Sequence, residues 1–236
     1  MAAGVRIEEL LSLRRQETEE GVIVPLGDIL VITDEHKKAA QEITALVLES
    51  YSGQKISIAI GAESGAGKSE ISHVVASSLF KSDKQLRSFI VHTDDFFALP
   101  HKERNELRRK SNLDSVGPAE IDFDQLNCVL KSFESDGQIL IPIMEFITSS
   151  AYKLLVDFKG IQVLICEGLY APMLDVRLKM FIDRDYHDNE DFNARRGKEV
   201  PDEFRRKVLE KEHQAVSELR KHVDYLITKD YALTKL

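Results

Sequence analysis

The sequence predicts an α/β fold in which a parallel sheet is covered by helices on both faces, giving three layers. Short apolar runs such as "KISIAI" and "VLIC" alternate with segments in which apolar residues recur at helical spacing. A glycine-rich loop, "GAESGAGKSE" at 61–70, joins the first core run to a helix-forming segment. The 236 residues are enough for a single domain and contain no internal repeat.

The elements follow from local patterns along the chain. Acidic residues at the start of a periodic segment, as at Asp34 and Asp122, indicate helix N-termini, and Pro201 opens the longest amphipathic stretch. We expect helices at 7–20, 34–51, 68–80, 101–112, 122–135 and 201–222. Strands are expected at 55–61, 88–94, 138–144, 161–168, 178–183 and 223–229. Residues 21–33 suggest short strands or a turn, and 149–160 a hairpin or a strand with a turn.

The domain organisation is expected to be one domain over 1–236, with an appendage at 1–50 before the core. The core then spans 55–228 and includes a polar lid at about 185–200. The role of the first 50 residues and the oligomeric state are left open by the sequence, a homo-oligomer being one option.

The composition narrows the function classes. The net charge is −8 and acids are mixed into each basic cluster, which argues against a nucleic-acid partner. The apolar runs are too short to span a membrane, and the first 20 residues lack the apolar core of a signal peptide. With only two cysteines, Cys128 and Cys166, no disulfide framework is expected. We therefore expect a cytoplasmic protein.

The loop at 61–70 is typical of phosphate binding. Its glycines let backbone N–H groups approach phosphates, and the following helix adds the positive end of its dipole. Lys68 is placed to reach the β- and γ-phosphates of a nucleotide, and Ser69 to reach Mg²⁺. Ala62 stands where the strict pattern has its first glycine. The predicted nucleotide-binding residues are Glu63, Ser64, Gly65, Ala66, Gly67, Lys68, Ser69 and Glu70.

Acidic residues follow two later strands. Asp94 and Asp95 come at the carboxyl end of "SFIVHT", where ligands gather in an open parallel sheet. Such an acid accepts a proton from a substrate hydroxyl or holds Mg²⁺, whereas its companion could simply cap the next segment. Glu167 ends the most apolar strand, where a buried carboxylate needs a partner such as Mg²⁺ or a basic group.

Two arginines, Arg195 and Arg196, lie in the polar segment after the strand at 178–183. Arginines on a lid can clamp phosphates and neutralise the charge that develops during phosphoryl transfer. A solvated basic helix is the alternative interpretation of these two residues.

Taken in order, these segments resemble the uridine kinase and phosphoribulokinase family of P-loop kinases. The matching pieces are "GAESGAGKS", "TDDFF", "NLDSVGPAEIDFDQL", "CEGLY" and "FIDRD…ARRG", over roughly residues 55–228. The resemblance implies a P-loop NTPase fold of the nucleoside-kinase type that transfers the γ-phosphoryl of ATP, with Mg²⁺, to a small-molecule hydroxyl.

The resemblance also implies roles for single residues. Asp94 would be the catalytic base, Asp114 would contact acceptor hydroxyls, and Glu167 would lie near both substrate and metal. The implied metal ligands are Ser69, Asp94 and Glu167, and the implied catalytic residues are Lys68, Asp94, Arg195 and Arg196.

The chain departs from the family on the acceptor side. Met144 stands where nucleoside kinases have a tyrosine, no histidine follows nearby, and the lid has fewer arginines. The acceptor is therefore either a uridine- or cytidine-like nucleoside or a sugar, polyol or hydroxy acid. A regulatory nucleotide-binding protein without turnover is a further alternative. A GTPase is disfavoured, because "LITKD" lacks the asparagine of the guanine-reading motif.

Overall fold

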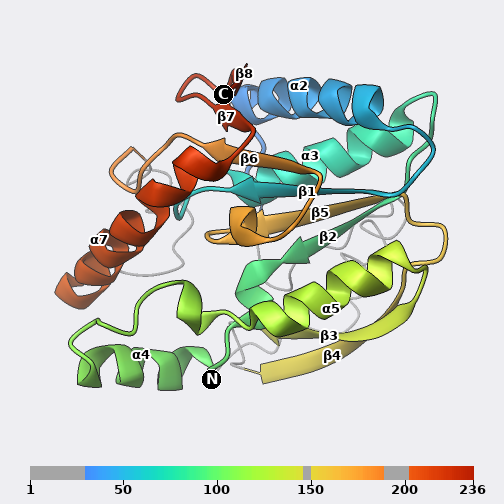
Figure 1. Ribbon diagram of the computed structural model, residues 1–236. Coiled ribbons are helices and arrows are strands. Elements are labelled where there is room, and N and C mark those ends of the chain that lie inside the picture. Colours follow the sequence, from blue (N-terminus) through green and yellow to red (C-terminus); the bar gives the residue numbers. More distant parts are fainter. Residues whose placement is uncertain (1–29, 146–149, 189–201) are drawn as a thin grey trace, which may run out of the picture.

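The computed structural model describes residues 30–145, 150–188 and 202–236, and its core is a six-stranded sheet (Figure 1). The strand order is β2-β5-β1-β6-β7-β8. The strands are β1 (Ile56–Gly61), β2 (Ser88–His92), β5 (Val163–Gly168), β6 (Leu178–Ile182), β7 (Tyr225–Ile227) and β8 (Leu233–Lys235). All neighbours pair in parallel except β7 and β8. The mostly parallel α/β sheet predicted from the sequence is confirmed.

Five α-helices and four short 3₁₀ helices accompany the sheet in the described residues. The α-helices are α2 (Asp34–Ser50), α3 (Lys68–Lys81), α4 (His101–Lys110), α5 (Phe123–Glu134) and α7 (Glu203–Ser217). The 3₁₀ helices are η1 (Thr93–Phe96), η2 (Pro118–Glu120), η3 (Ala171–Met173) and η4 (Glu218–His222).

The core consists of two apolar clusters, one on each face of the sheet. On one face, α2 and α3 pack on β1, β5 and β6 through residues such as Ile43, Val75 and Ile165. On the other face, α5 contributes Leu126 and Phe133, and the C-terminal end of α7 contributes Val216. This arrangement gives the three layers that alternating strands and helices predict.

Two features differ from the expected pattern. The apolar run at 138–144 belongs to β3 (Gln138–Glu145), which pairs antiparallel with β4 (Ser150–Asp157) in a separate two-stranded sheet. The short apolar strand resembles a buried parallel strand, but Leu140 and Leu155 are exposed on the hairpin's outer face. The edge strand β8 was not expected at all.

The packing does not follow the expected boundary between an N-terminal appendage and the core. Residues 34–50, grouped with the appendage, form α2, whose Ala39, Ala40 and Ile43 are fully buried against the core. The helix expected at 7–20 lies outside the described residues. None of the described helices is long and apolar enough to cross a membrane.

Strand register brings the predicted site to one edge of the sheet. Gly61 of β1 is the register partner of Gly168 in β5, and His92 of β2 is the partner of Glu167. The loops that follow β1, β2 and β5 therefore start side by side, which is where ligands bind in open parallel sheets. The helices α4 and α7 both lie on this side of the molecule (Figure 1).

Candidate active site

The loop after β1 has the backbone of a phosphate-binding loop. Gly65 and Gly67 have positive φ values of 78° and 85°, which side-chain-bearing residues rarely adopt. A Cβ on Gly67 would also lie 2.4 Å from Nε2 of His36. Ala62 is fully buried and has no positive φ, so the absence of glycine there leaves the loop geometry intact.

The loop leads into α3 without a side-chain cap. Gly67 is the N-cap residue, and within the described residues α3 has no side-chain cap hydrogen bond, so the N–H groups of its first turn lie beside the loop. An uncapped helix N-terminus preceded by glycines favours an anion. The Lys68 ammonium group donates to the Glu63 carbonyl oxygen at 2.9 Å, which holds it along the loop.

Ser69, Glu167 and His92 form a connected polar group beside the loop. The Ser69 hydroxyl donates to Glu167 Oε1 at 3.1 Å, and the same oxygen contacts Nδ1 of His92. Burial opposes charge on Glu167, but the hydrogen bond and charge of His92, together with Lys68 and Ser69, outweigh it and hold the Glu167 pKa below its ordinary value. Burial likewise lowers the His92 pKa, but the Glu167 carboxylate outweighs burial and raises it. We therefore treat the pair as charged.

Asp94 and Asp95 have different surroundings in η1. Asp95 is buried, and its Oδ1 accepts from the Met144 backbone N–H at 2.9 Å. This burial raises the Asp95 pKa to about 6. Asp94 is open to solvent at its tip, yet the surrounding protein and Glu167 raise its pKa, against the attraction of Lys68. Asp94 is thus the acid of the two that is free to meet a ligand.

The carboxylates of two acids in the loop segment have partners within the protein. The Glu63 carboxylate accepts from the Tyr186 backbone N–H at 2.9 Å and pairs with Nδ1 of His213 at 2.7 Å. Glu70 is buried and accepts from the Val31 backbone N–H at 3.4 Å. Both residues were predicted to bind nucleotide; their carboxylates have these protein partners, and their nucleotide contact stays a prediction. Glu63 ties the loop to the segment after β6 and to α7.

A second polar cluster lies on α4, η2 and α7. Arg108 forms two hydrogen bonds of 2.7 Å with the Glu120 carboxylate and a third of 3.2 Å with Glu212. All three side chains are buried. This cluster fixes α4 against both neighbours, and it lies close enough to the catalytic edge for Asp94 to influence the Glu212 pKa, which burial raises.

The remaining predicted residues are Asp114, Arg195 and Arg196. Asp114 is exposed in the turn after α4, and within the described ranges no hydrogen bond or ion pair links its side chain to the site. The backbone N–H of Asp114 donates to the Ser111 carbonyl at 3.0 Å. Arg195 and Arg196 lie outside the described residues.

The sequence analysis missed His92, Arg104 and Arg108, and also the acids that hold Arg108. His92 lies two residues before Asp94, and pairing of the two strand ends could have suggested its contact with Glu167. The arginines lie in "HKERNELRRK", where acids are mixed with bases and no local pattern marks a charged side chain as buried.

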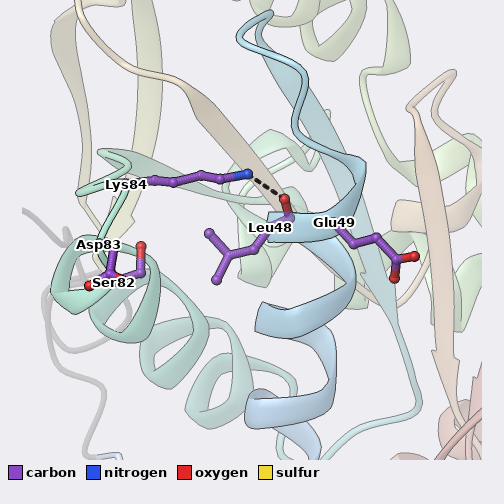
Figure 2. Close-up of a pocket in the computed structure, with 5 residues that line it drawn as sticks. All are labelled: Leu48, Glu49, Ser82, Asp83 and Lys84. Carbon is purple, nitrogen blue, oxygen red and sulfur yellow. Dashed lines mark hydrogen bonds between the residues drawn. The ribbon is translucent and has the colours of Figure 1, made fainter.

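A hollow on the surface lies away from these groups. Figure 2 shows it between the C-terminal end of α2 and the turn after α3, lined by Leu48, Glu49, Ser82, Asp83 and Lys84. The Lys84 ammonium donates to the Leu48 carbonyl at 2.6 Å. The phosphate loop is at the other end of α3, about 20 Å away along the helix. The hollow is therefore separate from the candidate active site.

The fold, the loop before α3 and the acids at the strand ends define a P-loop α/β protein of the kinase type. The chain belongs to the phosphoribulokinase / uridine kinase family, whose sequence profile matches residues 57–186. Over 143 residues it is 26% identical to uridine-cytidine kinase-like 1 of Mus musculus. That alignment covers 58% of this chain and only 25% of the relative's length.

Solved structures show the same fold at low identity. A candidate fructose transport system kinase from Silicibacter sp. TM1040 superposes with a TM-score of 0.57 at 17% identity, covering 78% of this chain and 95% of that one. A candidate uridine kinase from Bacillus stearothermophilus gives 0.57 at 15%, covering 81% and 98%. D-glycerate 3-kinase from Cryptococcus neoformans gives 0.54 at 13%, covering 85% and 97%.

Proposed function

We propose that this protein is a small-molecule kinase that transfers the γ-phosphoryl group of ATP to an alcohol, with Mg²⁺ as its metal. The observation that carries the proposal is the convergence of a phosphate loop and ionisable groups at one sheet edge. Ser69 and Glu167 are hydrogen-bonded at 3.1 Å, and Lys68 and Asp94 lie within electrostatic range of Glu167.

The described residues fit a nucleotide and a divalent cation. The uncapped first turn of α3 and the positive-φ glycines suit phosphate oxygens, and Lys68 supplies a positive charge beside them. Ser69 and Glu167 offer adjacent oxygens, the type of ligand that Mg²⁺ prefers. When bound, Mg²⁺ would neutralise the charge that develops on the transferred group. Arg195 and Arg196 are proposed to add positive charge from the lid.

Asp94 is proposed to accept the proton of the acceptor hydroxyl. Its tip is exposed, whereas Asp95 is committed to the Met144 N–H. The raised pKa of Asp94 makes it a stronger base than an ordinary carboxylate. Asp95 then has a positioning role, because it joins the base segment η1 to the end of β3.

Members and structural relatives of the family are named for several classes of acceptor. Met144 replaces the tyrosine of the nucleoside kinases, and its backbone is held by Asp95. The relatives are named for uridine-cytidine, fructose and glycerate kinases, so their names span nucleosides, sugars and hydroxy acids. Both a nucleoside and a non-nucleoside alcohol therefore enter the test. The two free cysteines, Cys128 and buried Cys166, agree with a reducing cytoplasm.

The proposal is tested by ADP release from ATP and Mg²⁺ with a panel of nucleosides, sugars, polyols and hydroxy acids. We expect ADP release that depends on one added acceptor and disappears in Lys68→Ala. The matched control is Lys37→Ala, which removes an exposed lysine of α2. ATP binding without acceptor-dependent turnover across the panel would overturn the kinase proposal.

A further inference from the structure

The helix α4 has an unusual buried face. Its two buried side chains are arginines, Arg104 and Arg108, which lie one turn apart on the same side. A surface helix normally buries apolar residues, because an arginine loses hydration on burial unless a partner replaces it. The surroundings of the two arginines show what each one does.

Arg108 has a complete set of partners. It is bound by Glu120 through two hydrogen bonds and by Glu212 through a third, so its charge is compensated within the protein. Two buried acids therefore bind this one arginine, and Glu212 also pairs with Arg205 at 3.8 Å. Arg108 is a structural residue that joins α4, η2 and α7.

Arg104 lacks such partners. Only 7% of it is exposed, and its guanidinium stacks on the Phe97 ring at 3.4 Å. Its Nε has no hydrogen-bond partner, and over residues 30–145, 150–188 and 202–236 no carboxylate pairs with it. Burial, followed by repulsion from Arg108, lowers the Arg104 pKa. A planar guanidinium fixed by stacking, with its donors unused, is suited to binding a carboxylate or phosphate.

A second unpartnered group shares these surroundings. Tyr170 is only 1% exposed and its hydroxyl has no hydrogen-bond partner among the described residues. Arg104 and Tyr170 are each influenced by the same four charged groups, Asp94, Arg108, Glu120 and Glu212. Two buried donors without partners among the described residues thus lie within electrostatic range of the proposed base.

We propose that Arg104, assisted by Tyr170, binds an anionic group of the acceptor, so that the substrate is a compact hydroxy compound carrying a carboxylate or phosphate. This inference rests on the kinase function proposed above and specifies its acceptor. Arg104 and Asp94 are in electrostatic range but not ion-paired, so one small molecule can place its anion at Arg104 and its hydroxyl at Asp94. Transfer forms the new phosphate ester at that hydroxyl, releases ADP, and leaves the hydroxyl proton on Asp94.

The test uses matched pairs of probes that differ by one anionic group. Glycerate is compared with glycerol for the carboxylate, and ribose 5-phosphate with ribose for the phosphate. Acceptor-dependent ADP release gives kcat/KM, and calorimetric titration of the full chain with a non-hydrolysable ATP analogue gives binding without turnover. We expect one anion to bind and to be phosphorylated, with its neutral partner at least about 100-fold poorer.

The variants assign the effect to Arg104. Arg104→Gln should raise KM for the anion about 30- to 100-fold, the range for a charged hydrogen-bonding partner, and leave KM for ATP within about twofold. Arg104→Lys should recover part of the loss, because the charge remains but the fork is absent. The control Lys102→Gln removes an exposed cation from the same helix and should change neither constant. Thermal unfolding verifies that each variant is folded.

The outcomes separate this inference from the kinase proposal. Equal or better use of the neutral probe, or anion binding that survives Arg104→Gln in a folded protein, overturns the anion site and leaves the kinase intact. Failure of both anions to bind also overturns it. Anion binding that is lost in Arg104→Gln, retained in Lys102→Gln and not followed by turnover supports the site and contradicts the kinase proposal.

Discussion

The two sides of the candidate active site are built on different principles. The proposed nucleotide side consists of consecutive residues, 61–70, whose backbone conformation suits phosphate binding. The acceptor side is assembled from side chains far apart in the sequence, such as Arg108 with Glu212 and Asp95 with Met144. The comparison shows why one half of a kinase can keep its motif while the other is rebuilt, since a local loop does not depend on the distant pairs.

The largest expected effect is a loss of turnover, and it should distinguish Asp94 from Asp95, which lie between the two sides. Asp94→Asn should lower kcat by about 10²- to 10⁴-fold, because the base is lost while the shape is kept. ATP affinity should stay within about twofold, since no part of the loop changes. Asp95→Asn serves as the matched variant. A larger fall in kcat for Asp95→Asn than for Asp94→Asn would show that Asp95, and not Asp94, is the catalytic base.

The acceptor side should also be where stability is most sensitive to charge. Arg108→Met leaves Glu120 buried without its cation and Glu212 with only Arg205 at 3.8 Å, so we expect a loss of about 3–5 kcal/mol in the free energy of unfolding. Urea unfolding measures it, with Lys110→Met on the exposed side of α4 as the control. A loss below about 1 kcal/mol would show that the cluster is not a structural anchor.

A pH dependence follows from buried Asp95. Its pKa of about 6 in the folded protein is above the ordinary value of 3.8. Between these values the folded protein retains a proton that the unfolded chain has released, so this group's contribution to stability falls as pH rises from about 4 to 6. The contribution is about 2–3 kcal/mol. The unfolding free energies of wild type and Asp95→Asn should therefore differ by a pH-dependent amount in this window, and a constant difference would contradict the shift.

The smallest effect concerns the side-chain link between Glu63 of the loop and His213 of α7. Glu63→Ala removes the acceptor of the Tyr186 N–H and the partner of His213, so we expect about 1–3 kcal/mol of destabilisation in urea unfolding. Glu106→Ala, an exposed acid of α4, is the control. If Glu63→Ala matches this control in stability but abolishes ATP binding, Glu63 serves the nucleotide and not the link.

The sequence allowed the nucleotide side to be predicted because its information is local. The strand "KISIAI", the glycines and Lys68-Ser69 are adjacent letters, and Asp94 and Glu167 directly follow apolar strands. The acceptor side was harder to predict from the sequence, because the burial of Arg104 and Arg108 depends on where α7 and η2 are packed. The side-chain partner of Glu63 could not be predicted for the same reason, since His213 is 150 residues away in the sequence. The pairing of β3 with β4 could not be predicted, because a short apolar run does not reveal its partner strand.

The most direct test of this two-part site is a calorimetric titration of ATP and Mg²⁺ into wild type, Lys68→Ala and Arg104→Gln. Lys68→Ala should weaken ATP binding by about tenfold or more, because it removes a charged contact with the phosphates. Arg104→Gln should bind ATP as wild type does. Wild-type ATP affinity in Lys68→Ala, or equal loss in both variants, would contradict the assignment of the loop to the nucleotide and of α4 to the acceptor.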